Sequence, residues 1–253
     1  MTSLLQPSFD LDLALAIDHF WISRLGKIGN QSAGRSGVIN GKNLDGFEHL
    51  VRQLVAHVGL PEGCVRSRNP APTLPGYFRP SKDWDLLIIH NQRLLAILEF
   101  KSQVGSFGNN FNNRTEEALG NATDLAHVIR RGLVDPARHI NASASPEPPD
   151  PRPPFTGYLM LLEDCTGSSR PIRAVSKNYS ILPEFASSSY ADRYRIFCER
   201  LMSESLYSSA ALVLTAQPVG AAPSTCRDAS VPTSARSFFT SLGGHLAAAA
   251  LSP

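Results

Sequence analysis

The sequence predicts an α/β protein in which helices flank a mixed central β-sheet. Along the 253 residues, short apolar runs of strand length alternate with longer stretches of helical character. In those longer stretches, apolar residues recur every three or four positions, as they do on one face of a helix. The resulting order is helix, strand, strand, helix, strand, helix, strand, which indicates a layered α/β domain.

The first two helices are separated by a polar segment. Residues 9–25 place apolar side chains at helical spacing and predict the first helix. Residues 26–43, "GKIGNQSAGRSGVINGKN", are rich in Gly, Ser and Asn and predict a flexible basic loop. Asn43 can cap a second helix over 44–58, which Gly59 then ends. Glu48 lies on the rim of the apolar stripe of that helix.

Two strands follow a proline-rich stretch. Residues 64–82 predict a long ordered loop that could hold an edge strand. The apolar runs at 84–90 and 94–101 predict a hairpin, with "HNQR" near its turn. The segment after it ends at Asn113, which can cap a helix that carries Glu116 at its third position and runs to about residue 131.

The remainder of the chain predicts two more buried strands, an amphipathic helix between them and a helix at the C-terminus. These elements fall at 155–163, 192–206, 210–216 and 236–251. We expect one domain over residues 1–253, in which 26–43, 141–154 and 217–235 are loops or insertions.

The composition limits the classes of protein that need consideration. The net charge of +2 does not by itself indicate a nucleic-acid-binding protein. The four cysteines are far apart and form no C-x-x-C pair, which argues against a zinc or redox motif. No apolar run reaches the roughly 18–20 residues of a membrane span, and the first residues lack a basic signal-peptide region. We therefore expect a cytoplasmic protein without a membrane partner.

The predicted hairpin brings three charged side chains together. Because side chains alternate faces along a strand, Glu99 and Lys101 should point the same way. Asp85 should lie opposite or diagonal to them on the neighbouring strand, depending on register. Burying unpaired charges at the end of an apolar hairpin is costly. Two acids and a lysine are tolerable there if the acids hold a divalent cation.

This cluster suits phosphodiester hydrolysis. Two carboxylates can bind Mg²⁺ through oxygen, and a lysine can position or deprotonate the attacking water and neutralise phosphate charge. Thirteen residues (86–98) separate Asp85 from Glu99-Phe100-Lys101, which is the spacing of a PD-(D/E)xK nuclease. Asp83 is a second candidate for the first acid, and Pro80 is not adjacent to either. The pattern alone also fits a solvated hairpin end with a surface Glu–Lys pair.

The next segment, "KSQVGSFGNNFNNRTEEALGNATDL" (101–125), adds candidates for DNA readout. Asn pairs bidentately with adenine, Arg pairs with guanine, and helix N-termini favour phosphate. The candidates in this segment are Asn109, Asn110, Asn112, Asn113 and Arg114. The alternative is an ordinary Gly/Asn turn before a capped helix.

Residues 78–125, from "FRPSKDWDLLI" through "EFKSQVGSFGNNFNNRTEEALGNATDL", resemble the XhoI family of type II restriction endonucleases. The resemblance implies a PD-(D/E)xK restriction-endonuclease-like core and Mg²⁺-dependent cleavage of double-stranded DNA at CTCGAG by a homodimer, leaving 5′ overhangs. Asp85 and Glu99 would be the metal ligands, Lys101 the catalytic lysine and Glu48 the N-terminal carboxylate of related nucleases. A cognate DNA methyltransferase is implied as functional partner, because an unprotected host genome would be cut.

Basic residues outside the motif are further candidates for phosphate contacts. They are Arg35, Lys42, Arg66, Arg68, Arg79 and Lys82, with Arg114 from the asparagine-rich segment. Two other functions stay open from the residues alone. One is a repair or recombination nuclease that recognises DNA structure, and the other is a DNA-binding protein that does not cleave.

Overall fold

The computed structural model of the chain describes residues 3–28, 43–68, 71–134, 152–220 and 223–251. The helices are α1 (Phe9–Ile28), α2 (Asp45–His57), α3 (Phe107–Arg130), α4 (Thr166–Ser169), α5 (Pro183–Ala186), α6 (Tyr190–Ser203) and α7 (Ala235–Ala250), with a 3₁₀ turn at Glu62–Cys64. The strands are β1 (Val65–Arg66), β2 (Thr73–Pro75), β3 (Ser81–Asp83), β4 (Leu86–His90), β5 (Arg93–Gln103), β6 (Phe155–Glu163), β7 (Ile172–Arg173), β8 (Ser187–Ser188), β9 (Ser209–Ala216) and β10 (Thr225–Asp228).

A six-stranded mixed sheet forms the centre of the molecule, which confirms the predicted fold class. Its strand order is β1-β4-β5-β6-β9-β10. The three central strands β5, β6 and β9 run parallel, and the strands toward both edges pair antiparallel. Parallel neighbours need a crossover connection, and here α3 joins β5 to β6 while α6 joins β6 to β9.

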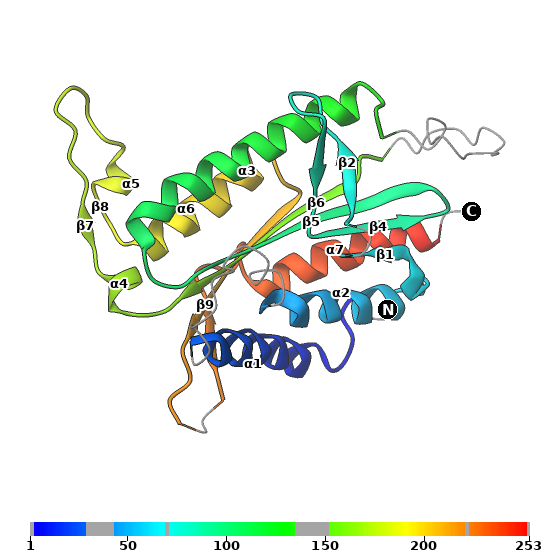
Figure 1. Cartoon of the computed structure of the whole chain (residues 1–253), viewed down its shortest axis with the longest axis horizontal. Coiled ribbons are helices and arrows are strands. Elements are labelled where there is room, and N and C mark those ends of the chain that lie inside the picture. The colour runs from blue at the N-terminus through cyan, green and yellow to red at the C-terminus, as the bar shows by residue number, and fades with distance from the viewer. Residues whose placement is uncertain (1–2, 29–42, 69–70, 135–151, 221–222, 252–253) are drawn as a thin grey trace.

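Helices cover both faces of the sheet (Figure 1). The helices α1, α2 and α7 lie on one face, and α3 and α6 lie on the other. The first face is closed by a core that includes Phe20, Phe47 and Phe238. The second is closed by Tyr158, Tyr194 and their apolar neighbours. The central strands are buried on both faces, and this is why their sequences are apolar without interruption.

The predicted hairpin is present as β4 and β5. Its loop consists of Asn91 and Gln92, both with positive φ, between the paired residues His90 and Arg93. Two left-handed residues in a two-residue loop match the right-handed twist of the flanking strands. The turn pairs His90 with Arg93, and an irregularity between Ile88 and Ile89 shifts the pairing by one residue, so that Leu86 lies opposite Leu98.

Two predicted helix caps are wrong. The N-cap of α2 is Leu44 and not Asn43, and it makes no side-chain capping bond. Asn113 lies inside α3, which begins at Phe107 after a turn with positive φ at Gly105 and Ser106. Phe107 is buried and stacks on Tyr190, so tertiary packing starts this helix seven residues earlier than the Asn–Glu capping pattern suggests. The predicted ends at Gly59 and near residue 131 are confirmed.

The other expected irregular segments differ in outcome. The stretch 217–235 contains β10, which pairs with β9 although all four of its residues are exposed. The short elements α4, β7, α5 and β8 between β6 and α6 were not predicted. Residues 29–42 and 135–151, which hold most of the other two expected loops, lie outside the described residues. None of the described helices combines the length and apolar character of a membrane span.

Candidate active site

Asp85 lies between β3 and β4, immediately before the first residue of β4. The register of the hairpin pairs Leu86 with Leu98, and continuing it by one residue places Asp85 opposite Glu99. Oδ2 of Asp85 accepts a hydrogen bond of 2.8 Å from the backbone N–H of Phe100. Its other oxygen accepts none from the described residues, so it can take a further ligand. The sequence left open whether Asp85 would lie opposite Glu99 or diagonal to it. The structure places the two residues directly opposite each other.

Asp85 is exposed at the pocket, but the protein packed around its carboxyl group displaces water and raises its pKa. The ammonium of Lys101 and the N–H of Phe100 oppose this effect, while the nearby carboxylate of Glu99 adds to it. The charged form of Asp85 is therefore held at a cost in the absence of a cation. Carboxylate oxygens are the ligands that Mg²⁺ prefers, so Asp85 with Glu99 suits a hard divalent cation.

Glu99 and Lys101 point to the same face of β5, as predicted. Nζ of Lys101 lies 3.0 Å from Oε1 of Glu99 and 3.0 Å from Oε1 of Glu117 on α3. Burial lowers the pKa of Lys101, but the carboxylates of Glu99, Asp85 and Glu117 outweigh it and the pKa is raised. Lys101 is thus a firmly protonated ammonium in this arrangement, suited to binding phosphate charge and orienting water.

A network that the sequence did not reveal holds Glu99, whose side chain is 0 % exposed. Nδ2 of Asn121 donates to both of its oxygens, at 2.9 and 3.1 Å, and the hydroxyl of Tyr207 donates to Oε2 at 3.1 Å. Oδ1 of Asn121 accepts a 2.8 Å bond from Nη2 of Arg79, which fixes which way the amide faces. Asp124 in turn binds Nε of Arg79 at 2.7 Å. Arg79, a predicted phosphate contact, takes part in the network around Glu99.

The only sign of this network in the sequence is Asn121 itself. It is a polar residue on the apolar face of a helix, between Ala118 and Ala122, both of which are buried. A buried amide needs a partner. Nothing in the sequence indicated that the partner would be Glu99, or that Tyr207 would join it from 108 residues away.

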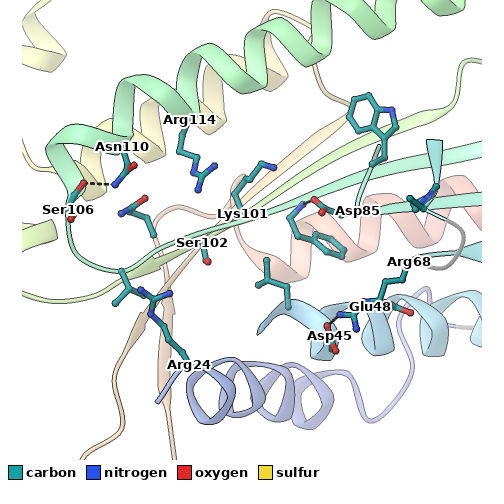
Figure 2. Close-up of a pocket in the computed structure, with 17 residues that line it drawn as sticks. Arg24, Asp45, Glu48, Arg68, Asp85, Lys101, Ser102, Ser106, Asn110 and Arg114 are labelled. Atoms are coloured by element: carbon teal, nitrogen blue, oxygen red, sulfur yellow. Dashed lines mark hydrogen bonds and ion pairs between the residues drawn. The ribbon is translucent and has the colours of Figure 1, made fainter. Parts of the chain in front are cut away.

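An open pocket of about 600 Å³ adjoins these residues. It lies between the N-terminal part of α3 and the helices α1 and α2, with β5 crossing its floor (Figure 2). Asp85, Lys101 and Glu48 line it together with Asn110 and Arg114. Arg24 of α1 also lines it, a residue that sequence reasoning assigned only to a packing helix. Asp85, Glu48, Lys101 and part of the predicted reading segment therefore share one cavity, while Glu99 is fully buried and does not line it.

Glu48 lies at the same pocket but is already engaged. Its Oε1 accepts from Arg52 at 2.9 Å and from Ser67 at 2.5 Å, and Arg68 lies 3.9 Å from Oε2. Among the described residues, no three acidic, histidine or cysteine side chains form a single metal-binding group. The candidate metal ligands are accordingly the pair Asp85 and Glu99, and Glu48 lies beside them.

The geometry distinguishes Asp85 from Asp83. Asp83 is exposed on β3 and accepts a 2.5 Å bond from Thr73, away from the pocket. Lys82, predicted to contact DNA, places Nζ 3.8 Å from Oε1 of Glu99 and 5.0 Å from the ring centre of Trp84. Lys82 therefore adds positive charge next to the buried carboxylate.

The predicted DNA-reading residues divide into two groups. Asn110 and Arg114 are one helical turn apart on α3 and line the pocket. Asn109, Asn112 and Asn113 are exposed and do not line it. Arg35 and Lys42 lie outside the described residues, and Arg68 forms an ion pair with Asp45. Arg66 donates to the backbone oxygen of Gly63.

A mixed sheet with helices on both faces, and an acid opposite Glu-x-Lys at one hairpin end, define a protein of restriction-endonuclease-like fold. The family model described as "Restriction endonuclease XhoI" matches residues 24–223. The chain belongs to this family of restriction endonucleases.

Three curated relatives accompany this match. The type II restriction enzyme XhoI of Xanthomonas vasicola is 42% identical over 202 residues, 77% of this chain and 75% of the relative. The type II restriction enzyme BstVI of Geobacillus stearothermophilus is 39% identical over 193 residues, 74% of this chain and 80% of the relative. The type II restriction enzyme AbrI of Azospirillum brasilense is 49% identical over 130 residues, 51% of this chain and 52% of the relative. No solved structure matches the chain.

Proposed function

We propose that this site-specific deoxyribonuclease hydrolyses double-stranded DNA at the palindrome CTCGAG, with Mg²⁺, and leaves 5′ overhangs. The observation that carries the chemistry is the placement of Asp85 opposite Glu99 with the ammonium of Lys101 3.0 Å from Glu99. Membership of the XhoI family supports the choice of site.

Each residue of the site has its own role in hydrolysis. Asp85 and Glu99 would hold Mg²⁺, which when bound lowers the pKa of water and balances charge on the phosphate. Lys101 stays protonated beside the acids, so it binds a phosphate oxygen and orients the attacking water. Asn121 and Tyr207 keep the Glu99 carboxylate in place. In the reaction one P–O bond forms to water and one P–O bond of the DNA backbone breaks. The attacking water gives up a proton to solvent, and the leaving oxygen takes one up to become a hydroxyl group.

The proposed partners follow from the palindrome and from host survival. A two-fold symmetric site calls for a homodimer, in which each copy presents one such centre to one strand. A cognate DNA methyltransferase protects the host genome at the same sequence.

The test uses two matched plasmids, one containing CTCGAG and one lacking it, each with Mg²⁺ and with EDTA. Cutting of the first plasmid alone, and only with Mg²⁺, is the expected result. Cutting of both plasmids would favour a repair or recombination nuclease that recognises DNA structure. A folded protein that shifts DNA and cuts neither plasmid would be a non-cleaving DNA-binding protein.

A further inference from the structure

Lys101 has a second carboxylate partner that the nuclease pattern does not contain. Oε1 of Glu117 lies 3.0 Å from Nζ of Lys101, the same distance as Glu99. The other oxygen of Glu117 binds Nη1 of Arg114 at 2.8 Å. Arg114, Glu117, Lys101 and Glu99 therefore form a continuous chain of charged contacts from the pocket to the buried acid.

These contacts use only some of the N–H donors of Arg114. It lines the pocket beside Asn110, and Figure 2 shows it reaching from α3 toward the strand that carries Lys101. Its Nε is buried and has no hydrogen-bond partner in the described part of the chain. A guanidinium offers five N–H donors in a fixed fork, so one edge can stay on Glu117 while the other binds an acceptor on DNA.

Glu117 owes its position to Arg114 and Lys101 more than to packing. Its side chain is 36 % exposed, and these two cations are its only ion-pair partners among the described residues. Burial raises its pKa, but the charges and hydrogen bonds of Lys101 and Arg114 outweigh this and the pKa is lowered. A change in the position of Arg114 would therefore move Glu117, and with it the ammonium of Lys101.

We propose that Glu117 is a positioning residue that couples the DNA contact of Arg114 to the placement of Lys101. This inference rests on the proposed function. When the bases in the pocket satisfy the open edge of Arg114, the guanidinium is fixed and Glu117 holds Lys101 against Glu99. When they do not, Arg114 is free to leave Glu117, and Lys101 loses one of its two anchors. Discrimination between sites then arises in the rate of cleavage as well as in binding.

The test compares Glu117→Gln with Glu116→Gln, an exposed neighbour on the same helix and a matched control. Single-turnover cleavage is measured at the wild-type site and at sites changed by one base, and binding to both is measured with Ca²⁺. Glu117→Gln should lower the ratio of the two cleavage rates by about 5- to 150-fold, the usual range of a coupling between sites. Its binding preference should stay that of wild type because Arg114 is retained.

A double-mutant cycle supplies the second readout. Arg114→Ala combined with Glu117→Gln should cleave the wild-type site no more slowly than Arg114→Ala alone, since both changes break one connection. The coupling would be overturned if the rate losses of the two single variants multiplied in the double variant. It would also be overturned if Glu117→Gln slowed cleavage equally at the wild-type and the changed sites. A wild-type protein that cuts a different sequence overturns only the proposed site, and the same comparison is then made at that sequence. A wild-type protein that cuts no DNA overturns both proposals.

Discussion

Lys101 and Glu99 are two residues apart on one face of β5, and Nζ of the lysine lies 3.0 Å from Oε1 of the acid. The acid is completely buried, while the lysine lines an open pocket. The positive charge of Lys101 offsets the cost of burying the negative charge of Glu99, and the carboxylate in turn stabilises the ammonium. The pair connects the buried interior of the protein with the open pocket.

Replacing Lys101 with Met should stop cleavage while DNA binding survives. The loss of one preorganised charge that stabilises the transition state typically lowers the rate by about 10²–10³-fold. Single-turnover cleavage and gel-shift binding with Ca²⁺ measure the two effects. Lys177→Met, on an exposed residue between β7 and β8, is the matched control. If binding and folding disappear together with cleavage, Lys101 is a structural residue.

Replacing Asp85 with Asn should stabilise the protein at neutral pH while abolishing cleavage. The protein packed around Asp85 raises the pKa of its carboxyl group in the folded state, so folding disfavours the charged form. Stability is then lost as the pH rises through that raised pKa, and Asn, which does not titrate, avoids the loss. We expect the variant to melt slightly higher at pH 7, by a small margin because Asp85 is exposed and solvent screens its charge. The difference should vanish below the pKa of the unfolded carboxyl group.

Thermal unfolding of both proteins without added metal, across a pH series, checks this prediction. An amide can still accept the hydrogen bond from Phe100, so the substitution keeps that contact. A variant that melts lower than wild type at pH 7 would contradict the predicted cost of the charge.

Replacing Asn121 with Ala should destabilise the protein and weaken cleavage. The change removes the donor to both oxygens of Glu99 and leaves Nη2 of Arg79 without its acceptor. An unsatisfied buried polar group costs about 1–3 kcal/mol of unfolding free energy. Urea unfolding measures the loss, and Asn112→Ala, on an exposed residue of the same helix, is the control. Equal stability of the two variants would mean that Asn121 does not support Glu99.

Replacing Asn110 or Arg114 should relax the choice of DNA sequence. Both line the pocket, and a good bidentate contact to a base contributes about 1–3 kcal/mol of discrimination. Cleavage of a set of sites that differ from CTCGAG by one base measures the change. Asn113→Ala should leave the choice of site unaffected, because Asn113 is exposed outside the pocket lining. The opposite ranking would place sequence readout elsewhere in the protein.

The sequence by itself determined the mixed sheet, the hairpin and the shared face of Glu99 and Lys101. Alternation along a strand puts Glu99 and Lys101 on one face whatever the surrounding fold. The apolar runs on either side of "HNQR" likewise predict the hairpin itself. These are local relations, in which a few neighbouring residues contain all the information. For the same reason, the apolar runs of β6 and β9 predicted buried strands correctly.

Only the tertiary structure decided what surrounds the triad. The start of α3 depends on the packing of Phe107 against Tyr190, and β10 forms because β9 offers it an edge, although its own residues are exposed. Asn121 and Tyr207 reach Glu99 from 22 and 108 residues away in the chain. A buried carboxylate must find donors, but which residues supply them is set by the approach of helices across the sheet, and no local pattern in the sequence records that approach.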